Sequence, residues 1–200
     1  MDKITSFLNN RFSSTRSAII TIDGFGSSGK TTYSEKLKSY LQNNGYSVII
    51  MHLDDFIHPT NIRYNNQYSE WECYYYLQWR FDYINHNIIE TFRNKENKQL
   101  PVQLYDKRKD NYITITINFS HFNIMILEGN FIQREELFIN PEFAIFINVP
   151  KEERLRRALE RDNYIGEKND IIEKYNNRYF PAEEYYEEKY KPMLLADRII

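Results

Sequence analysis

Residues 24–31, which read GFGSSGKT, constrain this chain more than any other feature of its sequence. They fit the pattern G-x-x-x-x-G-K-[S/T] at every fixed position, and three of the chain's six glycines lie within them. Glycines let a backbone wrap around a phosphate with its N–H groups pointing inward, in conformations that a Cβ atom would obstruct. The segment lies between a predicted strand and a predicted helix, whose positive N-terminal end favours the same anion. We therefore predict a phosphate-binding loop and not an ordinary glycine turn.

The residues of this loop are expected to divide the work of holding a nucleoside triphosphate. Lys30, which we expect on an exposed loop, should reach the β- and γ-phosphates, and the Thr31 hydroxyl should hold Mg²⁺. The predicted cofactors are ATP, or another nucleoside triphosphate, and Mg²⁺. The predicted nucleotide-binding residues are Gly24, Phe25, Gly26, Ser27, Ser28, Gly29, Lys30, Thr31 and Thr32.

Length and composition indicate one globular domain over residues 1–200. The content of 42% hydrophobic and 27% charged residues is that of an ordinary soluble protein. A formal net charge of −2 gives no general attraction to nucleic acid or to anionic lipid, so neither is expected as a partner. The single cysteine, Cys73, is interpreted as a packing residue in a reducing compartment. Whether the protein forms a homo-oligomer stays open.

The N-terminal residues 1–5 lack the basic start and long apolar run of a signal peptide. No window approaches the roughly 18 apolar residues of a membrane span. We therefore expect a cytoplasmic protein.

Short apolar runs alternate with helix-like stretches, which is typical of a parallel sheet covered on both faces. Buried strands are predicted at 17–23, 47–53, 123–127 and 143–149, with the start of a last strand at 196–200. The alternation of Ile and Thr in residues 112–118 predicts a hairpin with residues 100–105.

Helices are expected between these strands. The capping-box pair Ser69 and Glu72 predicts the start of one long aromatic helix that runs to about Phe92. The other predicted helices are 31–44, a lid helix at about 151–162, and a region at 170–190 that is interrupted at Pro181.

Two acidic sites follow predicted strands, at the carboxyl edge where open α/β sheets bind ligands. Asp54 and Asp55 follow the second strand, where a carboxylate can accept the proton of an attacking hydroxyl; a solvated turn or a helix N-cap stays open. Glu128 ends an apolar strand, where it could hold Mg²⁺ or could simply end the strand. Asp55 is a further candidate metal ligand.

Arg154, Arg157 and Arg161 lie on one face of the predicted lid helix, at spacings of three and four residues. Guanidinium groups on one face could close over phosphates and stabilise charge during transfer. A solvated helix with pairs such as Glu153–Arg157 is the alternative.

The order of the segments GFGSSGKTT, LDDF, PVQLYD, ILEG, RLRRALERD and ADRII resembles the uridine kinase group of P-loop kinases. That group is in turn similar to phosphoribulokinase and bacterial pantothenate kinase. The match runs from about Ser17 to the end, and YYYLQW and RYFPAEEYY are similar to a bacterial uridine kinase-like subgroup. Relatives usually continue past Ile200, and whether part of an adenine-side loop is missing here stays open.

The resemblance implies an α/β fold of the P-loop NTPase type, with a five-stranded parallel sheet flanked by helices and a small hairpin beside the acceptor. It implies that Asp54 is the catalytic base, assisted by Lys30, and that Glu128 lies near the metal. It places Arg157 and Arg161 in the lid. For the acceptor pocket it suggests Tyr105, with Arg63 as a weaker candidate.

The sequence departs from this group where the acceptor is recognised. Residues 67–71 (QYSEW) replace a Phe-Asp-His-Pro segment whose Asp binds ribose, and Lys107 follows Tyr105-Asp106 where a base-reading His is usual. We therefore expect a kinase for a hydroxyl of a nucleoside or related small metabolite, with uridine and cytidine as open candidates. The alternatives are a nucleotide-binding regulator and a plain NTPase.

Overall fold

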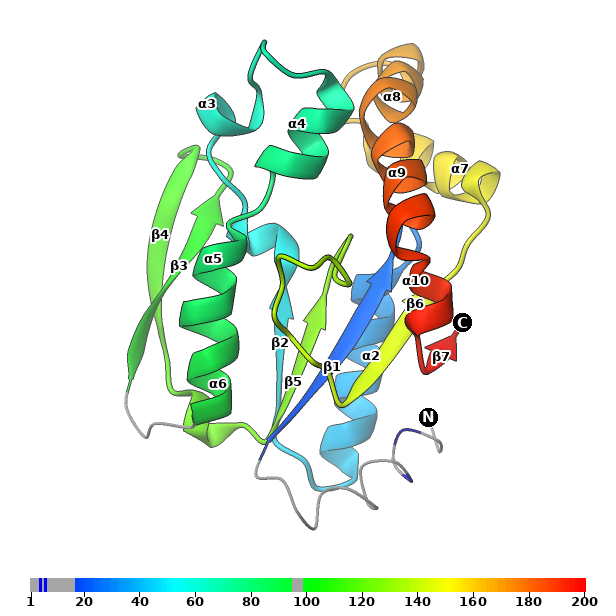
Figure 1. The fold of residues 1–200 in the computed structure, drawn as a ribbon. Coiled ribbons are helices and arrows are strands. Elements are labelled where there is room, and N and C mark those ends of the chain that lie inside the picture. The colour runs from blue at the N-terminus through cyan, green and yellow to red at the C-terminus, as the bar shows by residue number, and fades with distance from the viewer. Residues whose placement is uncertain (1–3, 5, 7–16, 95–98) are drawn as a thin grey trace.

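A five-stranded parallel sheet forms the centre of the part of the chain that this computed structural model describes, residues 4, 6, 17–94 and 99–200 (Figure 1). The strands, in spatial order, are β2 (Val48–His52), β5 (Ile124–Glu128), β1 (Ala18–Gly24), β6 (Phe143–Ile147) and β7 (Arg198–Ile199). Every neighbouring pair is parallel. The predicted P-loop NTPase fold is thereby confirmed. The expectations for residues 1–5 and for one domain over 1–200 include positions outside the described residues.

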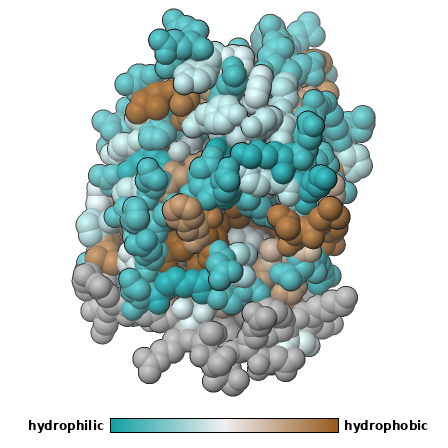
Figure 2. Space-filling view, viewed as in Figure 1, coloured by the Kyte–Doolittle hydropathy of each residue, from teal (hydrophilic) through white to brown (hydrophobic). Residues whose placement is uncertain are grey.

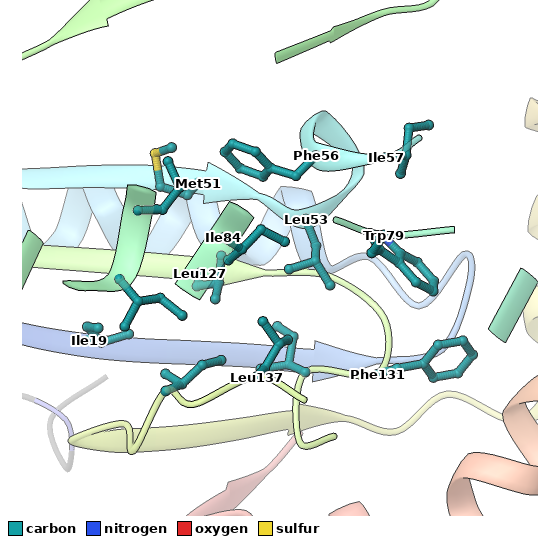
Figure 3. Close-up of a cluster of buried hydrophobic side chains, with 14 of the residues drawn as sticks. Ile19, Met51, Leu53, Phe56, Ile57, Trp79, Ile84, Leu127, Phe131 and Leu137 are labelled. Carbon is teal, nitrogen blue, oxygen red and sulfur yellow. The ribbon is translucent and has the colours of Figure 1, made fainter. Parts of the chain in front are cut away.

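Helices cover both faces of this sheet. On one face, α2 (Lys30–Asn43) packs Leu37 and Leu41 against alternate residues of the strands, such as Ile20 and Ile126. The other face is covered by residues from helices before and after the hairpin and from the segment that follows β5. Figure 3 shows the side chains of this second cluster, among them Ile19, Leu53, Trp79 and Phe131.

The remaining elements lie around this framework. The helical ones are η1 (Leu53–Phe56), α3 (Thr60–Arg63), α4 (Glu70–Leu77), α5 (Phe81–Ile84), η2 (Asn85–Ile89), α6 (Glu90–Asn94), η3 (Phe119–His121), α7 (Lys151–Arg161), α8 (Lys168–Lys174), η4 (Tyr175–Tyr179), α9 (Phe180–Tyr190) and α10 (Pro192–Leu195). The predicted hairpin is confirmed as β3 (Leu100–Asp106) and β4 (Asn111–Ile117), a separate antiparallel pair. Cys73 is buried, as its packing interpretation requires.

The single long helix predicted from Ser69 to about Phe92 is wrong. The capping box at Ser69 and Glu72 starts α4 as expected, but the chain leaves the helix after Leu77. Trp79 forms a β-bridge with Ile57, because the amide of His58 donates to Gln78 O at 2.9 Å and that of Arg80 donates to Phe56 O at 2.9 Å. These long-range bonds replace helical ones, so tertiary pairing overrides local helix propensity.

The predicted interruption at Pro181 is also wrong, because the helical path continues from α8 through α9. Proline lacks an N–H and its ring clashes with the carbonyl four residues earlier in a regular helix. Here the turn before it, η4, is π-helical, with hydrogen bonds that span five residues. The wider turn accommodates Pro181 at the start of α9.

Replacement of Gly129 by Ala tests the close approach of β5 to the segment after β2. A Cβ atom at Gly129 would lie 2.3 Å from the Cβ of Leu53, closer than side chains can approach. We expect Gly129→Ala to lower the free energy of unfolding by about 1–3 kcal/mol, the usual cost of overpacking. Chemical denaturation measures this; an unchanged value would show that Leu53 moves aside freely.

Candidate active site

The predicted phosphate-binding loop joins β1 to α2 and has the backbone conformations that its glycines permit. Gly24 and Gly29 have φ values of +150° and +95°, and a Cβ atom at Gly24 would lie 2.7 Å from Ile147 O. Side chains are disfavoured at both positions for these reasons. Gly29 is the N-cap of α2, so the positive end of that helix faces the loop. The hydroxyl of Ser28 in the same loop is buried and lacks a hydrogen-bond partner among the described residues, which fits a ligand oxygen at this position.

Lys30 lies at the first helical position after the loop and is buried, so the expectation of an exposed lysine was wrong. Its Nζ donates a hydrogen bond to Phe25 O at 2.9 Å. Burial lowers the pKa of Lys30, while the negative charges of Glu128 and Asp54 act in the opposite direction. The ammonium group is therefore held inside the loop among carboxylates.

A buried ion pair fastens the loop from outside. Glu183 on α9 accepts a hydrogen bond from the backbone N–H of Gly26 at 2.9 Å and pairs with Arg154 of α7 at 2.7 Å. Arg154 and Glu183 are only 4% and 3% exposed. Burial raises the pKa of Glu183, and the charge of Arg154 opposes that rise. Sequence reasoning grouped Arg154 with the lid face and missed Glu183, because nothing local marks their pairing.

Asp23 fastens the start of the loop through hydrogen bonds alone. Its carboxylate accepts the N–H of Gly24 at 2.7 Å and the hydroxyl of Tyr186 on α9 at 2.5 Å. Burial raises the pKa of Asp23 to about 6, although both hydrogen bonds favour its ionised form. A further contact joins Ser27 Oγ to the Tyr175 hydroxyl at 3.1 Å. The loop thus depends on the helices near the C-terminus.

Glu128 lies beside Thr31, as a shared metal site requires. The Thr31 hydroxyl donates to Glu128 Oε1 at 3.0 Å, and His52 Nδ1 lies 2.5 Å from the same oxygen. Burial acts to raise the pKa of Glu128, but its hydrogen bond with His52 and the charge of Lys30 lower it overall. Sequence reasoning missed His52; its place at the end of β2, in register with Glu128, was the available signal.

The oxygen donors at this edge suit Mg²⁺, which prefers carboxylate, hydroxyl and phosphate oxygens. Thr31 and Glu128 are in contact, and Asp55 is half-buried nearby, where burial raises its pKa and the charge of His52 opposes the rise. No cluster of three or more His, Cys, Asp or Glu side chains able to hold a metal occurs in the described residues. Mg²⁺ needs no such cluster when nucleotide phosphates supply the other ligands.

Asp54 lies in η1, directly after β2, and is exposed to solvent. Protein atoms nevertheless surround its carboxylate closely enough that desolvation raises its pKa, while the charge of Lys30 lowers it and that of Glu128 raises it further. A carboxylate with a raised pKa that lies near the loop lysine and Glu128 is a candidate base for phosphoryl transfer, and this role of Asp54 stays a prediction.

The lid arginines differ in their surroundings. Arg157 lies over the phosphate loop, with its NH1 3.4 Å from Ser28 O, and also pairs with Glu153 at 2.8 Å. Arg161 pairs with Asp162 at 2.6 Å and is largely exposed. Arg156, off this face, pairs with glutamates in solvent. The lid roles of Arg157 and Arg161 stay predictions; the arrangement favours Arg157.

Tyr105 and Arg63, the two acceptor-side candidates, are in direct contact. Arg63 donates to the Tyr105 hydroxyl at 2.8 Å, and that hydroxyl donates to Asp110 Oδ1 at 2.7 Å. Asp110 also accepts the backbone N–H of Thr60 at 2.9 Å, which fastens the hairpin to the start of α3. The acceptor roles of Tyr105 and Arg63 stay predictions.

Known proteins with similar sequences include uridine kinases. A uridine kinase of Ureaplasma parvum is 27% identical over 158 residues, which cover 78% of this chain and 72% of that protein. A uridine kinase of Ureaplasma urealyticum is 25% identical over a stretch of the same length. A family described as chromatin associated protein KTI12 matches residues 18–74, which contain the phosphate loop and Asp54.

Solved structures agree with this relation. A structure described as "Possible Uridine Kinase" from Bacillus stearothermophilus is 29% identical, with a TM-score of 0.77, over 100% of this chain and 97% of that one. D-glycerate 3-kinase from Cryptococcus neoformans is 13% identical, with a TM-score of 0.64, over 90% and 84% of the two chains, and shares the fold.

Fold, loop and relatives together define a nucleotide-binding P-loop kinase, an enzyme of the phosphotransferase class. The resemblance to uridine kinase-like P-loop kinases is thereby confirmed. No helix in the described part of the chain combines the length and the apolar character needed to cross a membrane.

The raised pKa of Asp23 predicts a pH dependence of stability. With a pKa of about 6 in the folded state and about 4 in the unfolded chain, Asp23 contributes stability fully below pH 4. That contribution, which amounts to at most about 3 kcal/mol of unfolding free energy, is lost as the pH rises through 6. Asp23→Asn should flatten the fall in unfolding free energy between pH 4 and 6, measured by urea denaturation. Parallel profiles for both proteins would contradict the assignment.

Proposed function

We propose that this protein transfers the γ-phosphoryl group of ATP to a hydroxyl of a nucleoside or a related small metabolite. The observation that carries the proposal is the direct hydrogen bond between Thr31 and Glu128, formed at the edge of the sheet where Asp54 and Lys30 also lie. A nucleotide-binding loop alone would serve any NTPase. A carboxylate beside the metal-site residues, free to take a proton, is what a kinase needs in addition.

Each residue has a defined part in the proposed transfer. Asp54 accepts the proton of the acceptor hydroxyl as its oxygen bonds to the γ-phosphorus, and the bond from that phosphorus to ADP breaks. Lys30 and the loop amides hold the phosphates, and Arg157 stabilises the charge that spreads over the transferred group. Thr31 and Glu128, with Asp55 nearby, would hold Mg²⁺, which would supply positive charge beside the β- and γ-phosphates. His52 orients the Glu128 carboxylate.

The acceptor is the less defined part of the proposal. The names of the similar proteins favour a nucleoside, and the paired Tyr105 and Arg63 offer hydrogen bonds and an aromatic face. The ribose-reading and base-reading residues usual in uridine kinases are missing from the sequence, so cytidine, uridine and other small alcohols stay candidates.

A screen of acceptors tests the proposal directly. Purified protein with ATP and Mg²⁺ is offered nucleosides, pantothenate-like alcohols and sugar phosphates, and both ADP and the phosphorylated product are measured. We expect ADP to form only with an acceptor, in equal amount to its phosphate ester. ADP formation without any acceptor would support a plain NTPase, and binding without turnover would support a nucleotide-binding regulator.

Asp54→Asn is expected to separate catalysis from nucleotide binding. Asparagine keeps the shape of the side chain but cannot take a proton at neutral pH, so kcat should fall about 10²–10⁴-fold. ATP·Mg²⁺ affinity, measured by isothermal titration, should stay within a few-fold of wild type. Asp55→Asn is the matched control, with a smaller loss that appears in the Mg²⁺ dependence. An inactive Asp55→Asn beside an active Asp54→Asn would reverse the two roles.

Arg157→Ala and Arg156→Ala form a second matched pair on α7. Arg157 lies over the phosphate loop and Arg156 lies in solvent, so only the first should lower kcat, with a smaller effect on ATP affinity. A loss of about tenfold or more is expected for Arg157→Ala, because lid arginines act on charge that develops during transfer. Equal, small losses at both positions would favour the solvated-helix interpretation.

A further inference from the structure

A cavity of about 330 Å³ lies on the face of the sheet that α9 also covers, beneath residues 132–141. This volume is at the lower end of the range for small-molecule sites. Figure 2, viewed from the side of Figure 1, shows a hollow near the middle of the molecule with apolar side chains around it. The lining is mainly apolar, with Ile132, Leu137, Ile139, Pro141, Ala144 and Leu195.

This cavity is separate from the proposed phosphotransfer site. Thr21 of β1 and Ala144 of β6, which pair across the sheet, form part of its wall. Thr21 precedes Gly24 by three residues, about 10 Å along an extended strand. None of the predicted nucleotide, metal, lid or acceptor residues lines it.

Two buried polar atoms of the lining have no hydrogen-bond partner among the described residues. One is the hydroxyl of Thr21, a residue only 1% exposed, and the other is Oε1 of Gln133. The amide nitrogen of Gln133 donates to Pro192 O at 3.1 Å, so only its oxygen is free. A buried polar atom without a hydrogen-bond partner is unfavourable, so the binding of a ligand that supplies such a partner would be favoured. The Gln133 oxygen can only accept, so the ligand must offer a donor.

The charged residues of the lining are already paired, which argues against a charged ligand. The guanidinium of Arg134 donates to Tyr75 O and to the carboxylate of Glu136. Glu135 pairs with Lys189 at 3.0 Å. A charged molecule would enter a mainly apolar space without a counter-charge, at a high desolvation cost.

A chain of hydrogen bonds connects the cavity wall with the phosphate loop. The backbone N–H of Gln133 donates to the Tyr186 hydroxyl at 2.9 Å. That hydroxyl donates to Asp23 at 2.5 Å, and Asp23 accepts the N–H of Gly24 at 2.7 Å. A displacement of Gln133 on ligand binding would therefore be felt at the first residue of the loop.

We propose that this cavity binds a small, uncharged, largely apolar molecule with a hydroxyl or amide donor, and that its occupancy is transmitted to the phosphate loop through Gln133, Tyr186 and Asp23. The site is independent of which acceptor the kinase uses. Its ligand would act on the enzyme from outside the site at which transfer is proposed.

Phenol and toluene serve as probes, because they have nearly the same shape and toluene has a methyl group where phenol has a hydroxyl. Titration of the isotope-labelled full chain, followed by backbone amide NMR shifts, should show saturable phenol binding near Thr21 and Ala144. Phenol should bind at least about fivefold more tightly than toluene, as a hydrogen bond to a buried partner implies. Thr21→Val, which keeps the shape, should lessen this preference, and Ala144→Leu, which fills the cavity, should abolish both titrations. Equal affinities in the wild type, or phenol binding unchanged by Ala144→Leu in a folded variant, would overturn the site.

The transmission has its own readout, which needs neither ATP nor an acceptor. In the wild type, phenol should shift the Gly24 amide resonance with the same affinity as that of Thr21. In Tyr186→Phe, which lacks the connecting hydroxyl, phenol should still bind but leave Gly24 unshifted. The proposed transmission would be overturned if phenol left the Gly24 amide shift unchanged in the wild type, or if the shift change persisted in a folded Tyr186→Phe variant.

Discussion

The phosphate loop keeps its shape because buried carboxylates hold its backbone from behind. Asp23 takes the N–H of Gly24, and Glu183, paired with Arg154, takes that of Gly26. Buried charges are costly unless they find ionic or hydrogen-bond partners; Glu183 is ion-paired with Arg154 and hydrogen-bonded, and Asp23 is hydrogen-bonded to Gly24 and Tyr186. Because α9 contributes Glu183 and Tyr186, the geometry of a loop near the N-terminus depends on a helix more than 150 residues later.

The parallel sheet then brings the proposed catalytic and metal-binding residues to this loop. β2 and β5 pair in a register that places His52 opposite Glu128, and β5 lies beside β1, which leads into the loop. Carboxyl ends of parallel strands share one edge, so the loop, the metal-site residues and Asp54 converge there without any long excursion of the chain. Asp110 connects the hairpin to α3, beside the proposed acceptor residues Tyr105 and Arg63.

Local patterns in the sequence were enough to predict the buried strands, the hairpin and the capping box at Ser69, and to mark Thr31 and Glu128 separately as candidate metal ligands; their direct contact appears only in the structure. Each depends on a short motif or on a period of apolar residues. The break at Trp79, the burial of Lys30 and the pairing of Arg154 with Glu183 depend on partners far along the chain. Their free energy comes from tertiary contacts, which no window of the sequence contains.

The π-helical turn η4 has a consequence for the orientation of α9. In a π-helical turn each hydrogen bond spans five residues, whereas in an α-helix it spans four. The turn η4 therefore contains one residue more than the same turn of a regular α-helix would contain. One residue corresponds to about 100° of rotation around a helix axis. Without that extra residue, Glu183 and Tyr186 would turn away from Gly26 and Asp23, and a different face of α9 would meet the loop. A single additional residue in η4 thus determines which face of α9 meets the phosphate loop, and so determines the contacts that hold the loop in place.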